Sequence, residues 1–273
     1  MNRIVGGKVA IVSDKPQTTR REIRGIATGS EWQLVLVDLP GVQRPRDPLT
    51  ERMQRRVESA LADSDAVLFV LNGEQQIGPG DRFIANAIKN AGVPAVTALN
   101  KVDRLDRQRT VTALTAAARL GVEGEIYPVS ARTGAGLEPL VGELVGLLPE
   151  GPFLYPPEEQ SDQSEQVRIA ELVREQVLLR TREELPHAVE VEVDELEERE
   201  DGLLVVRALV WAETESQKGI LVGAGGSMVK AVGSAARKEI EQLLGRRVHL
   251  DLRVRVRKGW RRDEALLDRL GIE

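Results

Sequence analysis

The tetrapeptide "NKVD", residues 100–103, carries the side chains that recognition of a guanine base requires. The carboxylate of Asp103 can accept hydrogen bonds from both N1–H and the exocyclic amine of guanine, whereas adenine offers no such pair of donors. Asn100 can bond the base or brace the neighbouring loop, and the alkyl stem of Lys101 can lie along the purine face. Such a tetrapeptide also occurs by chance on solvated loops, but here it directly follows an apolar run. We therefore predict a guanine site at the end of a strand.

The stretch "QLVLVDLPGV" predicts a second strand that runs into a sharp loop. In a nucleotide-binding fold, the carboxylate of Asp38 stands beside a metal, and the loop of Pro40 and Gly41 stands beside a terminal phosphate. We assign no catalytic side chain beyond this loop of Asp38 and Gly41. Upstream, one of the paired hydroxyls of Thr18 and Thr19 could ligate Mg²⁺, in a loop that becomes ordered around a γ-phosphate. Standing alone, the threonine-rich segment is more typical of an exposed turn.

A third loop, "VSAR", could complete the base site. The backbone N–H of Ala131 could reach the O6 carbonyl of guanine, and Ser130 could tighten the turn. Alone, this is an ordinary strand-to-turn signal. Its spacing from the tetrapeptide at residues 100–103 favours the base-binding interpretation.

All three loops need strands to position them. Four short apolar runs rich in β-branched residues predict strands that are buried on both faces: "WQLVLVD", "DAVLFVLNG", "VPAVTALNK" and "GEIYPVSA". Helical patterns lie between them, at residues 49–62, 80–91 and 107–120. This alternation predicts an α/β fold with a mostly parallel sheet and helices on both sides. In such sheets ligands bind beyond the carboxyl ends of the strands, where these loops lie.

Composition narrows the function classes. The 273 residues include no cysteine and only two histidines, which argues against a disulfide framework and against a thiolate or histidine zinc site. The net charge is -5, but residues 157–201 hold 16 acids and 5 bases, whereas residues 218–262 hold 12 bases and 3 acids. A split of this size predicts that one face meets a polyanion. The less favoured alternative is that the two charged segments form two solvated faces of one small domain.

A proline-rich, polar stretch divides the chain. We predict a nucleotide-binding domain at residues 1–150, a linker at 151–164 and a second domain at 165–273. The second domain has the predicted order helix, strand, strand, helix, helix, strand, with a last short helix. This order is typical of a small α+β domain.

The glycine cluster of this second domain has the spacing of an RNA-binding loop. Gly223, Ala224, Gly225 and Gly226 form a G-x-x-G between two helical segments, and such glycines let an RNA backbone approach closely. A glycine cluster alone is more often a plain turn between helices. Here its position in the order of elements, within the basic part of the chain, favours RNA binding.

A basic strand follows the glycine cluster. Because successive side chains of a strand point to opposite faces, Arg253, Arg255 and Arg257 share one face of this strand, and Lys258 extends the basic surface. We predict that they contact phosphates, against the alternative of a solvated edge. Trp260 could equally stack on a base or pack in the core.

The motifs together resemble the Era family of bacterial Ras-like GTPases with a C-terminal KH domain. The resemblance rests on "GGKVAIVSDKPQTTR", "DLPGV", "NKVD", "VSA" and "SQKGILVGAGGSMVKAVGSAARKEIEQLLG", and it covers essentially the whole chain. It implies a Ras-like P-loop NTPase sheet followed by a type II KH domain, with GTP or GDP and Mg²⁺ as cofactors. It further implies a cytoplasmic monomer that binds the 3′ region of small-subunit ribosomal RNA in the pre-30S particle, with a peripheral contact to the cell membrane. Ala224 stands where the family often has lysine, and Val42 stands where Ras-like enzymes place a water-orienting glutamine.

The phosphate loop of such enzymes is not found in this sequence. No G-x-x-x-x-G-K-[ST] occurs, and the last part of the family helix that follows that motif begins here at Met1 and Asn2. We therefore expect the sheet to lack its first strand, neighbouring apolar strands to be exposed, and GTP to bind poorly. A start codon assigned too late is the account we favour over a true truncation.

Three functions remain open. The first is an assembly factor for the small ribosomal subunit, controlled by GTP binding and hydrolysis. The second is a nucleotide-independent KH protein with a degenerate GTPase half. The third is a metabolic GTPase whose C-terminal half contacts protein, which salt-sensitive binding to ribosomal RNA would exclude.

Overall fold

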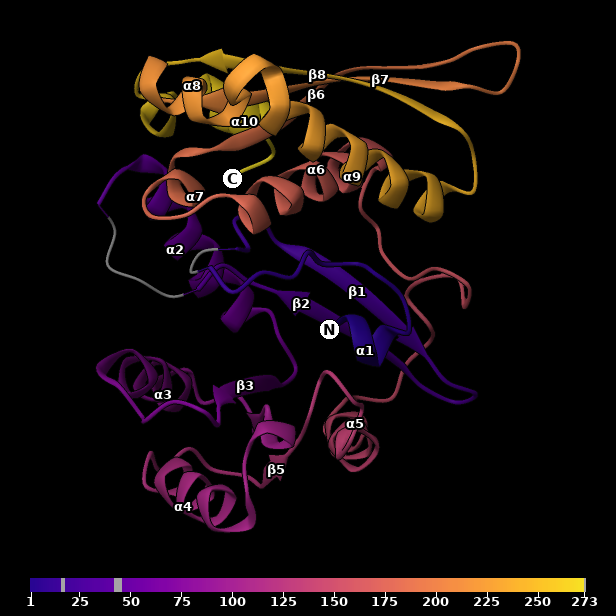
Figure 1. Cartoon of the computed structure of the whole chain (residues 1–273). Coiled ribbons are helices and arrows are strands. Elements are labelled where there is room, and N and C mark those ends of the chain that lie inside the picture. The colour runs from indigo at the N-terminus through magenta and orange to yellow at the C-terminus, as the bar shows by residue number, and fades with distance from the viewer. Residues whose placement is uncertain (16–17, 42–45, 273) are drawn as a thin grey trace.

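The computed structural model describes residues 1–15, 18–41 and 46–272 (Figure 1). The predicted helices at 49–62, 80–91 and 107–120 are present within two residues of their expected ends. The first half contains α1 (Asn2–Val5), β1 (Ile23–Thr28), β2 (Gln33–Asp38), α2 (Pro48–Ala62), β3 (Val67–Asn72), α3 (Pro79–Ala91), β4 (Ala95–Asn100), the 3-10 turn η1 (Val102–Arg104), α4 (Arg107–Ala118), β5 (Ile126–Pro128) and α5 (Leu137–Gly146).

The strands of the first half form two sheets. β3, β4 and β5 are parallel in that order, as predicted. β2, however, pairs antiparallel with β1, a strand that the apolar runs did not reveal. The turn between them is closed by a 2.9 Å hydrogen bond from Gly29 N to Trp32 O. So short a turn joins only antiparallel strands, because a parallel pair needs a crossover of a dozen or more residues.

No ladder joins β2 to β3 in the described part of the chain. One apolar core nevertheless serves both sheets, since Leu34 of β2 and Val96 of β4 are buried in the same cluster. Val70 on β3 is 53% exposed, which is unusual for a residue of an apolar strand.

The second half is a three-stranded sheet covered by helices. The antiparallel pair β6–β7 continues into a parallel pair β7–β8, and α6 and α9 lie side by side against the sheet (Figure 1). Its elements are α6 (Glu165–Arg180), α7 (Leu185–Ala188), β6 (Glu190–Glu198), β7 (Leu204–Ala212), α8 (Glu215–Val222), the 3-10 turn η2 (Ala224–Gly226), α9 (Ser227–Leu244), β8 (Val248–Val256), the 3-10 turn η3 (Trp260–Arg262) and α10 (Glu264–Arg269).

No single helix in the described ranges is long and apolar enough to cross a membrane. Only the pair 215–222 and 224–244, counted together across a 41° bend, meets the length and composition of a span.

The segment between the two halves lies against the first sheet. Residues 149–164 form neither helix nor strand. Leu154 N and Tyr155 N nevertheless donate to Gln33 Oε1 at 2.8 and 2.9 Å, and Ile26 N donates to Gln160 O at 2.9 Å. These bonds hold the connection against β1 and β2. The domain boundaries at 150 and 165 stay a prediction.

Trp260 is a packing residue at the junction of the two halves. It is fully buried together with Leu49 and Met53 of α2. Its Nε1 donates to the carbonyl of Ala188 at 2.9 Å. A buried ring whose polar atom is bonded in this way is not available to stack on a base.

A buried ionic cluster also joins the halves. Arg20 and Arg21, which precede β1, bond Glu190 at the start of β6 at 2.9 and 3.2 Å. Arg21 and Arg174 both bond Glu171 of α6. Burial raises the pKa of Glu190, but Arg21, Arg20 and Arg174 outweigh that effect and lower the pKa to about 2. The segment before β1 is thereby fixed to the second half by charge pairs that exclude water.

Candidate functional site

The predicted base-binding loop lies at the end of β4. Asn100 is the last residue of this strand, and its Oδ1 accepts hydrogen bonds from Lys101 N at 2.8 Å and Ala131 N at 2.9 Å. Lys101 has a left-handed backbone with φ of 68°, which turns the chain sharply into η1. Of the two roles predicted for Asn100, the structure shows bracing of the loop. The N–H of Ala131, expected to meet guanine O6, is bonded to Asn100 here.

Asp103 presents an ionised carboxylate at this loop. Ser130 Oγ donates to Asp103 Oδ1 at 2.7 Å, and Arg132 Nε donates to Oδ2 at 2.9 Å. The bond from Ser130 and the nearby charge of Arg132 hold the pKa of Asp103 below its ordinary value. Two N–H donors of a base need such a charged acceptor. Sequence reasoning did not single out Arg132 as a partner of Asp103, because no spacing rule links two residues that meet only through the fold.

Lys101 is held beside the same loop by an acid from the end of β3. Its Nζ lies 3.4 Å from Glu74, which also bonds Arg104 at 3.2 Å. These two cations lower the pKa of Glu74, Arg104 through the larger effect. The ammonium is thus anchored while the alkyl stem stays free to cover a flat ligand.

The second candidate loop brings one of the two threonines to Asp38. Thr19 Oγ1 donates to Asp38 Oδ2 at 2.9 Å, whereas Thr18 Oγ1 bonds Lys15 O at 2.7 Å. Burial raises the pKa of Asp38, and the bond from Thr19 only partly opposes this. Thr19 is therefore the better placed of the two candidate magnesium ligands. No cluster of three or more metal-ligating side chains occurs among the described residues.

The loop after Asp38 is described only in part. Pro40 and Gly41 follow β2, and a Cβ on Gly41 would meet no atom of the described residues within 4 Å. The predicted role of Val42 lies outside the described residues.

The threonine segment is also bound to the second half. Arg174 of α6 donates through Nη2 to the carbonyl of Thr18, and Glu175 accepts from Val12 N at 2.7 Å. Lys8 bonds Glu175 as well. Any movement of this segment on ligand binding must therefore strain or break contacts with α6.

In the glycine cluster, Gly223 and Gly225 differ sharply in the space available for a side chain. Gly223 has φ of 73° and ψ of 169°, and a Cβ there would lie 2.8 Å from Met228 N. Gly225 has φ of 57°, but a Cβ there would meet nothing within 4 Å. Gly223 is therefore required for the turn itself, while Gly225 leaves space above the loop. Ala224 and Gly226 complete η2 and its exit into α9.

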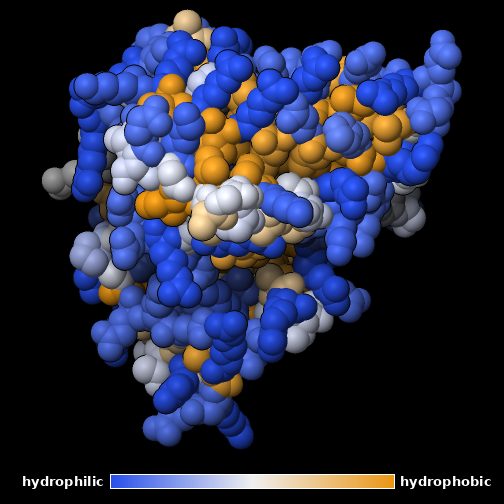
Figure 2. Space-filling view, turned by 45° about the horizontal axis from the view of Figure 1, so that its top comes forward, coloured by the Kyte–Doolittle hydropathy of each residue, from blue (hydrophilic) through white to orange (hydrophobic). Residues whose placement is uncertain are grey.

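A groove of about 480 Å³ runs beside this turn, between α9 and β8. Lys230 and Arg237 of α9 line it, with Gly233 between them and Leu250 and Leu252 of β8 opposite. Figure 2 shows an apolar band across this half of the molecule, bordered by hydrophilic residues. Sequence reasoning did not name Lys230 or Arg237, although their spacing of seven residues on one helix was a usable signal.

The predicted arginines of β8 are not among the residues that line this groove. Leu252 and Val254 of β8 pack against the helical core, so that alternation directs Arg253 and Arg255 to the opposite face of the sheet. Arg253 bonds Asp251 at 2.7 Å.

Of the two basic residues after β8, Arg257 forms an ion pair and Lys258 does not within the described ranges. Arg257 Nε bonds Asp263 at 2.8 Å, and the guanidinium lies 6.0 Å from the ring centre of Trp211. Arg255 and Lys258 have no ion pair within the described ranges. The role of these four residues as RNA ligands stays a prediction.

Two family models match the chain. The model of the KH domain matches residues 184–261, and that of the 50S ribosome-binding GTPase matches residues 1–101. The first match contains the glycine turn and groove, and the second contains Asp38 and ends within the base-binding loop.

Curated relatives match over nearly the full length. GTPase Era of Mycobacterium sp. (strain KMS) is 44% identical over 275 residues, which cover 99% of this chain and 92% of the relative. GTPase Era of Halothermothrix orenii is 42% identical over 272 residues, with the same coverage. Because these alignments cover 99% of the chain, both halves occur in the relatives in the same order.

Solved structures match equally widely. A crystal structure of a variant of Aquifex aeolicus Era bound to GDP·AlF4⁻ has a TM-score of 0.94 at 31% identity, covering 99% of this chain and 93% of that one. A crystal structure of Era in complex with MgGDPNP and nucleotides 1506–1542 of 16S ribosomal RNA has the same score and identity, with 99% and 92% covered. Since the arrangement of both halves and the sequence of each agree with these relatives, the chain belongs to the GTPase Era family.

Proposed function

We propose that this protein is an assembly factor for the small ribosomal subunit that binds guanine nucleotide with one half and ribosomal RNA with the other. The observation that carries the proposal is the ionised carboxylate of Asp103, presented at the end of β4 and held by Ser130. A carboxylate in this position selects a base with two adjacent N–H donors. Relatives of this chain have been crystallised with GDP·AlF4⁻ and with MgGDPNP and 16S ribosomal RNA.

The residues present fit the base part of GTP or GDP better than the phosphate part. Asp103 and Lys101 offer the charge and the flat cover that guanine needs. Thr19 and Asp38 offer the two oxygens that would hold Mg²⁺, directly or through water. Bound Mg²⁺ would neutralise phosphate charge. The motif G-x-x-x-x-G-K-[ST], which supplies the backbone nest and lysine of a phosphate loop, does not occur in these 273 residues.

In the second half, RNA would enter the groove beside the glycine turn. The open space above Gly225 admits a phosphodiester, and Lys230 and Arg237 supply charge along the groove. Leu250 and Leu252 offer apolar contact for bases that are not stacked on one another. We propose the 3′ region of small-subunit ribosomal RNA, within the pre-30S particle, as the target.

Filter binding tests this part of the proposal. The RNA of the 3′ end of the small subunit should bind more tightly than a scrambled control, and salt should weaken both. Equal affinity for the two RNAs at every salt concentration would contradict specific recognition.

A nucleotide-independent RNA-binding protein is the second candidate function. The groove favours it, because all the residues that line the groove belong to α9 and β8, so RNA could bind there without the first half. Titration with a fluorescent GTP analogue separates the two candidates, with RNA affinity measured with and without GTP. A change in RNA affinity on adding GTP, but not ATP, supports the GTP-controlled factor. Mass measurement of the native protein tests whether a phosphate loop accompanies this sequence in the cell.

We further propose domains at 1–150 and 165–273, a monomeric state, and a cytoplasmic location with peripheral contact at the inner face of the membrane. Sedimentation of the purified protein tests the monomeric state. Its sedimentation together with vesicles of anionic lipid tests the membrane contact. A metabolic GTPase without an RNA target would show no salt-sensitive binding to ribosomal RNA.

A further inference from the structure

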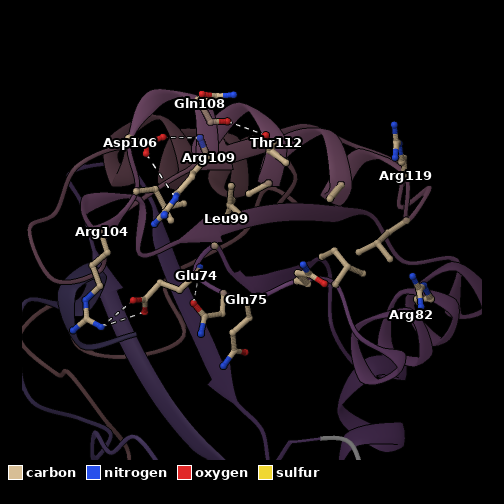
Figure 3. Close-up of a pocket in the computed structure, with 18 residues that line it drawn as sticks. Glu74, Gln75, Arg82, Leu99, Arg104, Asp106, Gln108, Arg109, Thr112 and Arg119 are labelled. Carbon is tan, nitrogen blue, oxygen red and sulfur yellow. Dashed lines mark hydrogen bonds and ion pairs between the residues drawn. The ribbon is translucent and has the colours of Figure 1, made fainter.

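We propose that the cleft between α3 and α4 binds an acidic, amphipathic helix of a partner protein. The cleft has a volume of about 1000 Å³ and borders the base-binding loop, since Glu74 and Arg104 line it, but its lining includes neither Asp103 nor the glycine turn (Figure 3).

The shape of the cleft fits a helix. Its lining residues on and after α4 extend from Gln108 to Leu120, a length of about 20 Å at the rise of an α-helix. Leu99, which is fully buried, forms part of the floor, and the small side chains of Ala113 and Ala116 line the wall. Small residues on one wall let a second helix approach closely, and three turns of helix fill this length.

The charged residues that line the cleft favour an acidic ligand. Four arginines and two acids line it. Both acids are already engaged, since Glu74 bonds Arg104 at 3.2 Å and Asp106 lies 3.7 Å from Arg109. Figure 3 shows Arg104 and Arg109 toward one end and Arg82 and Arg119 toward the other, with Leu99 between them.

Arg82 of α3 and Arg119 at the end of α4 carry the unbalanced charge. Both are exposed, and neither has an ion pair among the residues that the structure describes. A guanidinium presents a planar fork that suits a carboxylate, so two such groups beside an apolar floor favour glutamates flanking leucines.

A helix fits better than an extended peptide because the cleft offers no free strand edge. β3 and β4 pair with each other along their whole length beneath it. An extended peptide would therefore leave its backbone groups without partners, whereas a helix satisfies its own.

The lining also favours protein over RNA. None of the described lining residues is aromatic, so the cleft has no platform on which bases could stack. Its apolar part consists of aliphatic side chains set below the rim. Such a floor suits leucine or isoleucine side chains, with the charges restricted to the edges.

Fluorescence anisotropy with a defined probe tests the proposal on the whole chain. The probe is a fluorescein-labelled peptide, LEELLEELLEELLE, and the control peptide has lysine in place of every glutamate. We expect the acidic peptide to bind and the basic one not to bind. Replacing both Arg82→Ala and Arg119→Ala should weaken binding about tenfold, as loss of two exposed charge pairs predicts.

Two further variants distinguish binding in the cleft from general electrostatic attraction to the protein. Arg107→Ala removes an exposed arginine of α4 that does not line the cleft, and it should bind as the wild type does. Thr112→Glu places an acid in the cleft at an exposed helical position, and it should abolish binding without harming the fold.

Three results would overturn the proposal. The first is equal binding by the wild type and the variant lacking both arginines. The second is equal loss of binding in Arg107→Ala. The third is a U12 oligonucleotide that binds with the same dependence on Arg82 and Arg119, which would assign the cleft to RNA.

Discussion

Replacing Gly225 by aspartate should weaken RNA binding while leaving the fold intact. The position has φ of 57° and ψ of 23°, a left-handed conformation that aspartate and asparagine adopt more readily than other side chains. A Cβ there meets no atom within 4 Å, so the variant adds a side chain to open space rather than to a packed contact. That open space is where a phosphodiester must enter.

The magnitude follows from the charge. A carboxylate about 4 Å from a phosphate costs roughly 1 kcal/mol in water and roughly 4 kcal/mol at an effective dielectric constant near 20. The loop is open to solvent, so we expect about 2 kcal/mol, or roughly a 30-fold loss of affinity. Gly225→Asn is the matched control, because it has the same shape without the charge, and it should lose only a few-fold.

Filter binding at several salt concentrations measures both variants on the 3′ end of small-subunit ribosomal RNA and on a scrambled RNA. The difference between Gly225→Asp and Gly225→Asn should shrink as salt rises, because screening weakens the repulsion. Thermal melting checks that both remain folded. If Gly225→Asp binds as tightly as the wild type, the glycine cluster is only a turn. If aspartate and asparagine lose affinity equally, bulk rather than charge is responsible.

Five other substitutions test separate parts of the structure. Asp103→Asn replaces an acceptor by a donor and should shift selectivity from guanine toward xanthine nucleotide, as competition binding would show; unchanged guanine binding would contradict the assignment. Glu190 has a pKa of about 2 in the folded protein against 4.5 in the unfolded chain. The stability that its charge contributes is therefore complete above pH 4.5 and is lost as the pH falls toward 2. Glu190→Gln should lower the free energy of unfolding by roughly 3–5 kcal/mol at neutral pH and should flatten this acid dependence in thermal melts. Gly223→Ala forces a side chain into a conformation open only to glycine and should lower stability by roughly 1–3 kcal/mol, so an unchanged melting temperature would contradict the tight turn at this position. Lys230→Ala and Arg255→Ala should each reduce the salt slope of RNA binding by about 0.7, one phosphate contact on a single strand; an unchanged slope for either variant would contradict a phosphate contact at that residue.

The parts of the site that sequence reasoning predicted are those built from neighbouring residues. The loop at residues 100–103 was placed at a strand end because the apolar run before it is short and β-branched. The turn at Gly223 was placed between two helices because glycines separate two helical patterns. Alternation along β8 correctly placed Arg253 and Arg255 on one face, but it did not say which face the helices cover.

The tertiary structure decided how these local pieces meet. Trp260 packs against α2 and Ala188, so that its burial depends on a helix some two hundred residues earlier. Arg20 and Glu190, 170 residues apart, form a buried pair that no spacing rule links.

The sequence by itself determined most of the strand and helix segments, though not β1, and the loop residues with donors and acceptors for guanine and for RNA. These features follow from backbone preferences and from patterns that repeat within a few residues. Only the tertiary structure decided that Arg132 holds Asp103, that Thr19 rather than Thr18 meets Asp38, and that a groove opens between α9 and β8. The physical reason is that such contacts depend on how whole elements pack, which is set by the shape and burial of surfaces assembled from distant segments.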